Sequence, residues 1–232
     1  MEKWIGGVNP SSLLKHRFPH NMHKITLIST VHEQVGKCNA DELCEIIEKI
    51  SPKVIFLEAL EKTYSDYEKL IFSSFGIFNK KLEISAIQRY GVNTTFKYVP
   101  VLDNGLSDSF EKKYSIVCEN REMQNLIDNF DSLAAEHGFK FLNSVESIKL
   151  HDEMRMLEKR LLNESEISKL ANDDIDTYEN SMLGNIYSYC KTNKFNTAIF
   201  MCGVAHRKSI IEKIEKFNVQ EEIDLSWAIF GE

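Results

Sequence analysis

The feature that most constrains the fold is a strand, helix, strand succession in residues 24–58. Residues 24–30 (KITLIST) form a short apolar run with β-favouring threonines, and residues 54–57 (VIFL) form a second, fully apolar run. Between them, residues 43–50 carry apolar side chains at helical spacing. Two buried strands joined by one helix predict a parallel pair with a right-handed crossover, and therefore an α/β fold.

The sequence also predicts where this first helix begins and ends. Asn39 is placed to cap the helix, and we expect Glu42, at the third helical position, to reach back to the cap. Ser51 and Pro52 should end the helix, because proline cannot continue it.

Three further runs predict the rest of the sheet. Residues 98–102 (YVPVL) contain Pro100, which cannot donate to a strand ladder, so we expect this strand at a sheet edge. Residues 197–202 (TAIFMC) predict a buried strand that is followed by a helix, and residues 225–230 should close the sheet. We therefore expect an open, mostly parallel sheet flanked by helices.

The middle of the chain has a different character. Residues 108–137 and 146–190 are rich in Glu, Lys, Leu, Met and Asn, with apolar positions at helical spacing. They predict a mainly helical portion at about 108–190 within one domain of residues 1–232. The aromatic segment 70–78 (LIFSSFGIF) is either a flap over a site or the end of a core helix.

Composition excludes several classes of function. The chain has 28 Lys and Arg against 35 Asp and Glu, a net charge of −7, which argues against binding to nucleic acid. No apolar run approaches the roughly 20 residues of a membrane span. The N-terminus lacks the pattern of a secretory signal, so we expect a cytoplasmic protein. Five cysteines without a Cys-x-x-Cys pair predict reduced thiols.

Common catalytic motifs are also missing from the sequence. It has no Gly-x-Gly-x-x-Gly after the first strand and no Gly-Lys-Ser/Thr of the Walker type, so we expect no nucleotide cofactor. It has no Gly-x-Ser-x-Gly elbow, which argues against a serine hydrolase of the common kind.

Polar residues that suit catalysis follow three of the predicted strands. His32, Glu58 and His206 each come where an apolar run ends. Because the carboxyl ends of parallel strands face one crevice, we expect the three side chains to meet there. Two imidazoles and a carboxylate suit a divalent metal such as Mn, Co or Zn. Singly, each residue has an ordinary alternative: a loop or capping histidine, or a glutamate paired with a lysine or arginine.

Two of these residues lie in motifs that resemble a known family. Residues 29–32 (STVH) and 203–206 (GVAH) are similar to the paired Gly-x-x-His motifs of the TraB/TIKI superfamily, whose relatives include GumN proteins, haem-binding ChaN proteins and erythromycin esterases. Glu58 stands where that family has a glutamate ending its second strand. The similarity is concentrated in residues 24–60 and 176–215.

The chain departs from the family pattern at two places. Ser29 stands where glycine is usual. The family often carries an Arg-Glu-x-x-Met segment before its last strand, whereas residues 178–182 read YENSM, with Glu179 but without the arginine. If that arginine holds an anionic group, the substrate of this chain differs. Arg121, followed by Glu122, is a substitute, although a surface charge pair on a helix is its simpler role.

Four further residues are candidates for substrate binding: Arg207, Glu33, Asp103 and Glu179. Arg207 lies near a predicted helix N-terminus and could attract an anionic group, with solvated helix surface as the alternative. Glu33 could act as a base beside His32, or be exposed. Asp103 ends a predicted strand, but Asp before Asn-Gly is also ordinary turn chemistry.

The resemblance implies a metal-assisted hydrolase or peptidase, a histidine-based esterase or plain ligand binding, since all three occur in the superfamily. Our leading hypothesis is a metal-dependent hydrolase of a peptide, or of a small ester or amide, in which a metal-bound water attacks the carbonyl. The alternatives are a metal-independent esterase with a histidine base, and a non-catalytic binding or regulatory module that uses the helical middle. The oligomeric state stays open, with a homo-oligomer as one alternative.

Overall fold

The fold is built on one five-stranded sheet, seen in a computed structural model that describes residues 23–61, 81–105, 107–163, 165–221, 223 and 225–232. The strand order is β3-β2-β4-β1-β5, and every pairing is parallel. The strands are β1 (His23–Thr30), β2 (Val54–Leu60), β3 (Lys97–Leu102), β4 (Thr197–Gly203) and β5 (Leu225–Ile229). The predicted α/β fold with a parallel sheet is confirmed.

The predicted edge position of the proline-containing strand is also confirmed. Strand β3, which contains Pro100, pairs only with β2, so the missing N–H of the proline costs no inner ladder bond. Strand β5 lies at the opposite edge, against β1. The central strand β4 is flanked by β2 and β1, and this order brings the ends of those three strands together.

Helix α1 (Ala40–Ile50) begins and ends where the sequence predicts. The Asn39 side chain accepts from the backbone N–H groups of residues 41 and 42, and Ser51 ends the helix with a left-handed φ of 50°. The expected return bond from Glu42 to the cap is wrong. The Glu42 carboxylate instead accepts from the backbone N–H of Phe139, at 3.2 Å. A tertiary contact has replaced the local one.

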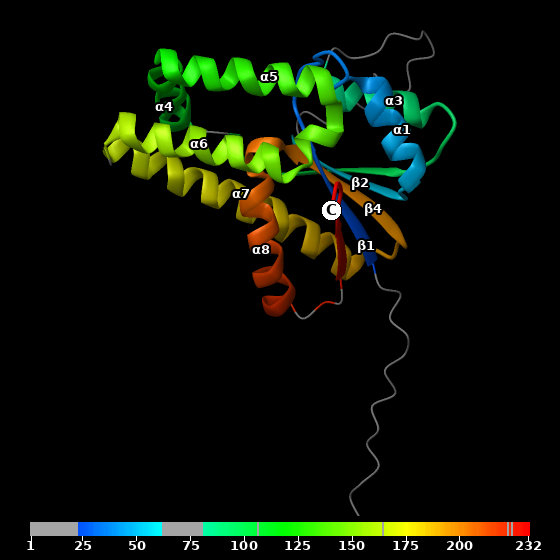
Figure 1. The fold of residues 1–232 in the computed structure, drawn as a ribbon. Coiled ribbons are helices and arrows are strands. Elements are labelled where there is room, and N and C mark those ends of the chain that lie inside the picture. The colour runs from blue at the N-terminus through cyan, green and yellow to red at the C-terminus, as the bar shows by residue number, and fades with distance from the viewer. Residues whose placement is uncertain (1–22, 62–80, 106, 164, 222, 224) are drawn as a thin grey trace, which may run out of the picture.

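Helices cover both faces of the sheet (Figure 1). Alternate strand residues divide between two cores, so that Ile55 and Leu57 pack with α1 and α3 while Val54 and Phe56 pack with α7 and α8. The remaining helical elements are α3 (Leu82–Gly91), α4 (Asp108–Cys118), α5 (Arg121–Leu142), α6 (Val145–Leu162), α7 (Glu166–Thr192), η1 (Val204–His206) and α8 (Arg207–Gln220). This burial on both faces explains why the strands read as continuous apolar runs.

Helices α4, α5, α6 and the first part of α7 form the predicted helical middle. They pack against one another and project to one side of the sheet (Figure 1). Helix α5 bends at Gly138, whose φ is 58°, and a Cβ there would collide with the Glu42 carboxylate. The glycine thus allows α5 to bend toward α1 and the sheet.

Two further results bear on the sequence predictions. The aromatic segment 70–78, expected as a flap or a helix end, lies outside the described residues. Within the described part of the chain, no helix has the length and apolar character of a membrane span.

Candidate active site

The carboxyl ends of the three inner strands, β2, β4 and β1, lie next to one another at one end of the sheet. In the ladders, Leu57 pairs with Met201, and Thr30 pairs with Gly203. Glu58 follows Leu57 directly, and its Oε2 accepts from the backbone N–H of Gly203 at 2.6 Å. Parallel register therefore places the Glu58 carboxylate at the point where β4 turns toward His206.

Both oxygens of the Glu58 carboxylate are engaged. While Oε2 accepts from Gly203, Oε1 accepts from the hydroxyl of Tyr178 on α7, at 2.7 Å. The Nε2 atom of His206 lies 3.6 Å from the same Oε1. The Tyr178 ring stacks on the imidazole, with ring centres 5.5 Å apart. Burial and the charge of Glu58 raise the pKa of Tyr178 far above its usual value, so its hydroxyl stays a donor.

A second carboxylate holds the other side of the His206 ring. Glu179 on α7 is 2% exposed at its side chain, and its Oε1 lies 2.8 Å from His206 Nδ1. Its Oε2 accepts from Ser209 at 2.5 Å and lies 3.0 Å from Lys213 Nζ. Burial acts to raise the pKa of Glu179, but bonds from His206 and Ser209 and nearby positive charge lower it overall.

The ionised Glu179 determines what His206 can do. A carboxylate accepts, so Nδ1 of His206 must donate, and the neutral ring then keeps Nε2 as an acceptor. Because the ring is pinned by Glu179 on one side and stacked on Tyr178, its Nε2 has a fixed direction. This is the arrangement of a base oriented by a buried carboxylate.

His32 makes a similar pair with a different carboxylate. Its Nδ1 lies 3.2 Å from Oε1 of Glu83 on α3, and that oxygen also accepts from Thr30 at 2.8 Å. The hydrogen bond to Glu83 raises the pKa of His32, burial opposes it, and the charges of Glu83 and Glu58 add to the rise. The His32 side chain is 63% exposed, against 13% for His206.

The structure therefore brings together two of the three expected ligands. The side chains of Glu58 and His206 lie close together, whereas His32 pairs with Glu83. The charge of Glu58 still contributes to the raised pKa of His32. Among the described residues, no three His, Cys, Asp or Glu side chains are placed to hold one metal ion. The expected three-ligand centre is thus not assembled in this arrangement.

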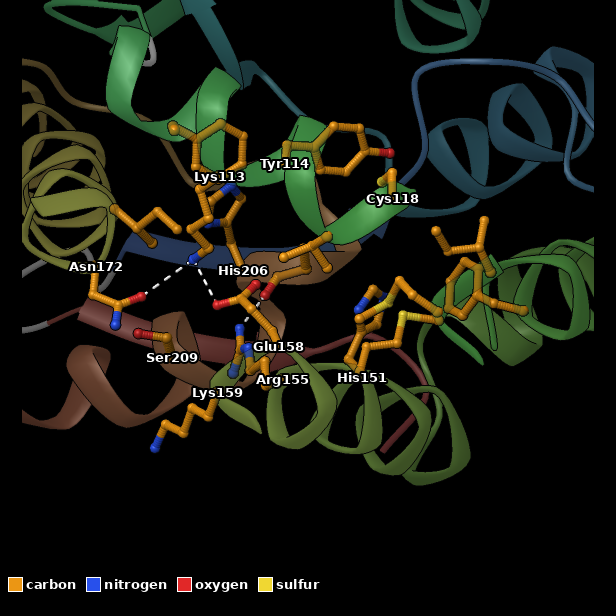
Figure 2. A pocket seen from close by; sticks show the side chains of 18 of the residues that line it. Lys113, Tyr114, Cys118, His151, Arg155, Glu158, Lys159, Asn172, His206 and Ser209 are labelled. Carbon is orange, nitrogen blue, oxygen red and sulfur yellow. Dashed lines mark hydrogen bonds and ion pairs between the residues drawn. The ribbon is translucent and has the colours of Figure 1, made fainter. Parts of the chain in front are cut away.

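His206 and Glu179 line a cavity of about 510 Å³. The rest of the cavity lies between helices α4, α5, α6 and α7 (Figure 2). Lys113 lies within it, 2.7 Å from a Glu158 carboxylate oxygen and 3.3 Å from Asn172 Oδ1. The helical middle thus forms most of the wall of a pocket that His206 also lines.

A further histidine in the cavity was not anticipated. His151 on α6 has a buried Nε2 that makes no hydrogen bond to the described part of the chain. Burial lowers the pKa of His151 to about 4, and the positive charge of Arg155 adds to this effect. The ring is therefore neutral at pH 7 and can bond a ligand without carrying charge.

Three of the four candidate substrate-binding residues make contacts that do not involve His206. Asp103 is held by Ser181 at 2.7 Å and Asn185 at 2.9 Å, and these bonds lower its pKa. Glu33 is exposed in the bend after β1. Only Glu179 joins His206.

Arg207 is built into the protein interior. Its side chain is 1% exposed and donates to Asn143 Oδ1 and the Asn143 carbonyl oxygen, both at 3.0 Å, and to the Phe230 carbonyl oxygen at 2.9 Å. Asn143 Oδ1 also accepts from the backbone N–H of Ser29 at 2.7 Å. Arg207 therefore joins α8, β1 and the C-terminal residues, and it does not face a substrate from solvent.

Sequence reasoning missed Glu83, Tyr178 and His151. Glu83 had a signal, because it is a carboxylate inside the apolar run 82–87 (LEISAI), where an acid needs a buried partner. Tyr178 directly precedes the candidate Glu179. His151 sits among charged helix residues, and nothing in the pattern marks it as a cavity residue.

Comparison with protein-family models, curated proteins and solved structures found no match to this chain. The resemblance of residues 29–32 and 203–206 to the TraB/TIKI superfamily therefore stays a prediction. Function is inferred below from the geometry of the side chains.

Proposed function

We propose that this chain hydrolyses an ester or amide bond, with His206 as the general base. The observation that carries the proposal is the pair formed by His206 Nδ1 and the buried Glu179 carboxylate, 2.8 Å apart, in the wall of a cavity. A pinned histidine beside a pocket suits proton transfer to and from a bound substrate.

In the proposed reaction, His206 Nε2 takes a proton from a water molecule as the water oxygen bonds to the substrate carbonyl carbon. The imidazolium then lies between the carboxylates of Glu179 and Glu58. It returns the proton to the leaving oxygen or nitrogen as the bond to the carbonyl carbon breaks. Tyr178 and Gly203 hold Glu58 in place through this cycle.

A second candidate is the metal-dependent hydrolase, favoured by a specific distance. Two ligands of one tetrahedral zinc lie roughly 3.4 Å apart, and His206 Nε2 and Glu58 Oε1 are 3.6 Å apart. The Nδ1 bond to Glu179 also matches the carboxylate that commonly supports a metal-bound histidine. Mn, Co or Zn would lower the pKa of a bound water. The donor set fits at these two positions, but His32 faces Glu83.

Chelation tests the proposal and separates the two candidates. The purified full chain is dialysed against EDTA, and hydrolysis of p-nitrophenyl acetate and of a fluorogenic peptide is measured before and after adding Mn²⁺, Co²⁺ or Zn²⁺. Activity that survives chelation and is lost in His206→Ala supports the general base. Activity that needs an added metal, and is lost in both His206→Ala and His32→Ala, selects the metal-dependent candidate.

Absence of hydrolysis under every condition contradicts both candidates. In that case the third sequence hypothesis, a non-catalytic binding module built on the helical middle, remains.

A further inference from the structure

The cavity is apolar over most of the wall that lies away from His206. The apolar side chains come from α4, α5 and α6, and they include Phe110, Val117, Met123, Ile127, Phe130 and Met154. Val117, Met123 and Phe130 are buried although they line the cavity. An apolar wall of this kind gains free energy when it removes an apolar ligand group from water.

Several charged groups at the cavity have partners within the protein. The ammonium of Lys113 contacts the Glu158 carboxylate, and the Arg155 guanidinium donates to the carbonyl oxygen of Ala205 at 2.5 Å (Figure 2). Glu179 is matched by Lys213. A charged ligand group would have to break one of these pairs, so an uncharged group fits the cavity better.

A buried polar atom in this wall makes no hydrogen bond to the described part of the chain. It is Nε2 of His151, which is buried and neutral at pH 7. A buried polar atom without a hydrogen bond destabilises the folded chain, and a ligand atom that bonds it removes that cost. The cavity thus combines an apolar surface with a buried hydrogen-bonding atom at His151.

From these features we infer that the cavity binds the hydrophobic acyl group of the substrate and that His151 Nε2 hydrogen-bonds a polar atom of the same molecule. The substrate class is an uncharged ester or amide of a medium-length alkanoic acid or an arylalkanoic acid. This inference rests on the proposed hydrolysis at His206, because His206 and Glu179 line the same cavity.

Chain-length dependence tests the inference on the full-length protein. The kcat/KM values for p-nitrophenyl acetate, butyrate and octanoate are compared, and binding of 2-decanone, an uncharged ketone that cannot be hydrolysed, is measured by saturation-transfer NMR. We expect kcat/KM to be at least about tenfold higher for octanoate than for acetate, because each buried methylene favours binding. We also expect a clear 2-decanone signal.

Two methionines on α6 give a matched pair of variants. Met154 lines the cavity, whereas Met156 is 72% exposed on the same helix. Met154→Trp should fill the cavity, bring the octanoate-to-acetate ratio close to one and remove 2-decanone binding. Met156→Trp should retain both. His151→Phe should weaken substrate binding, raising KM, and His151→Gln, which keeps a polar group, should restore part of it.

The outcomes separate this inference from the proposed function. Equal kcat/KM for acetate and octanoate together with no binding of 2-decanone overturns the acyl cavity, yet leaves hydrolysis intact. Binding of 2-decanone with no ester hydrolysis supports the cavity as an apolar ligand site and contradicts the proposed function. Equal effects of Met154→Trp and Met156→Trp contradict the placement of the acyl group. Should Met154→Trp fail to fold, the wild-type series and 2-decanone binding still decide.

Discussion

Two histidines stand at equivalent ends of two paired strands, yet they are in different environments. His206 is 13% exposed, is held by Glu179 and faces Glu58. His32 is 63% exposed and contacts Glu83. Each has a carboxylate at Nδ1, but only His206 also borders the cavity made by the helical middle.

The difference shows that the strand end places each histidine, whereas the helices that pack over it supply the groups that determine what the ring can do. Helix α7 brings Tyr178 and Glu179 to His206, and α8 adds Ser209 and Lys213 behind that carboxylate. Among the described residues, His32 contacts Glu83 on α3, and its side chain stays largely exposed. We therefore assign the reacting role to His206 within the proposal, and the following predictions test this distinction.

The largest expected effect is on turnover. His206→Ala should lower kcat by about 10²- to 10⁴-fold, the usual contribution of general acid–base catalysis. His32→Ala should change kcat little if no metal is used. Steady-state kinetics with p-nitrophenyl octanoate measure both variants, and equal large losses would break the distinction in favour of a shared metal.

The next effect concerns the two supporting carboxylates. Glu179→Gln should lower kcat by about 10- to 100-fold, because the His206 ring loses the charge that orients it. Glu83→Gln should have a far smaller effect on kcat. Circular dichroism checks that both variants fold. An equal loss in the two variants would mean that His32 takes part in the reaction.

A third prediction concerns stability and the buried His151. Its pKa falls from 6.5 to about 4 in the folded chain, so the unfolded state binds more protons between these two values. Stability must therefore decrease as the pH falls, by about 2 kcal/mol between pH 7 and pH 5 from this group. Urea unfolding at the two pH values measures the difference. His151→Phe should remove that part of it, and an unchanged difference would contradict the burial of the ring.

The smallest expected effect is at His32. Its pKa is raised in the folded state, so its pairing with Glu83 stabilises the chain below pH 6.5, and this contribution is lost as the pH rises through the folded-state pKa. Because the ring is exposed to solvent, His32→Gln should cost less than about 0.5 kcal/mol at pH 5.5 and almost nothing at pH 9. Urea midpoints at both pH values check this sign, and a larger cost at pH 9 would contradict it.

The sheet and the meeting of Glu58 with His206 could be predicted from the sequence. Short apolar runs identify buried parallel strands, and parallel strands bring their carboxyl ends to one edge. Glu179 could be singled out from the segment YENSM, although its contact with the His206 ring could not. These features could be predicted because they depend on the direction of the strands, which the sequence pattern indicates.

Features that depend on how helices pack could not be predicted. Glu42 looks like a capping residue, but the bend of α5 at Gly138 brings the Phe139 N–H to it. Arg207 looks like an exposed anion-binding residue, but α8 turns it toward Asn143. His32 looks like a third ligand, but α3 presents Glu83 to it. In each case a partner distant in sequence overrides the local pattern.

Selective modification of histidine tests the central claim most directly. In the His32→Gln variant, diethyl pyrocarbonate is added stepwise, and ester hydrolysis is followed while peptide mass spectrometry maps the modified rings. The account predicts full activity at the start and a loss that parallels modification of His206. Activity that persists with His206 fully modified, or that is already absent in the unmodified variant, would contradict it.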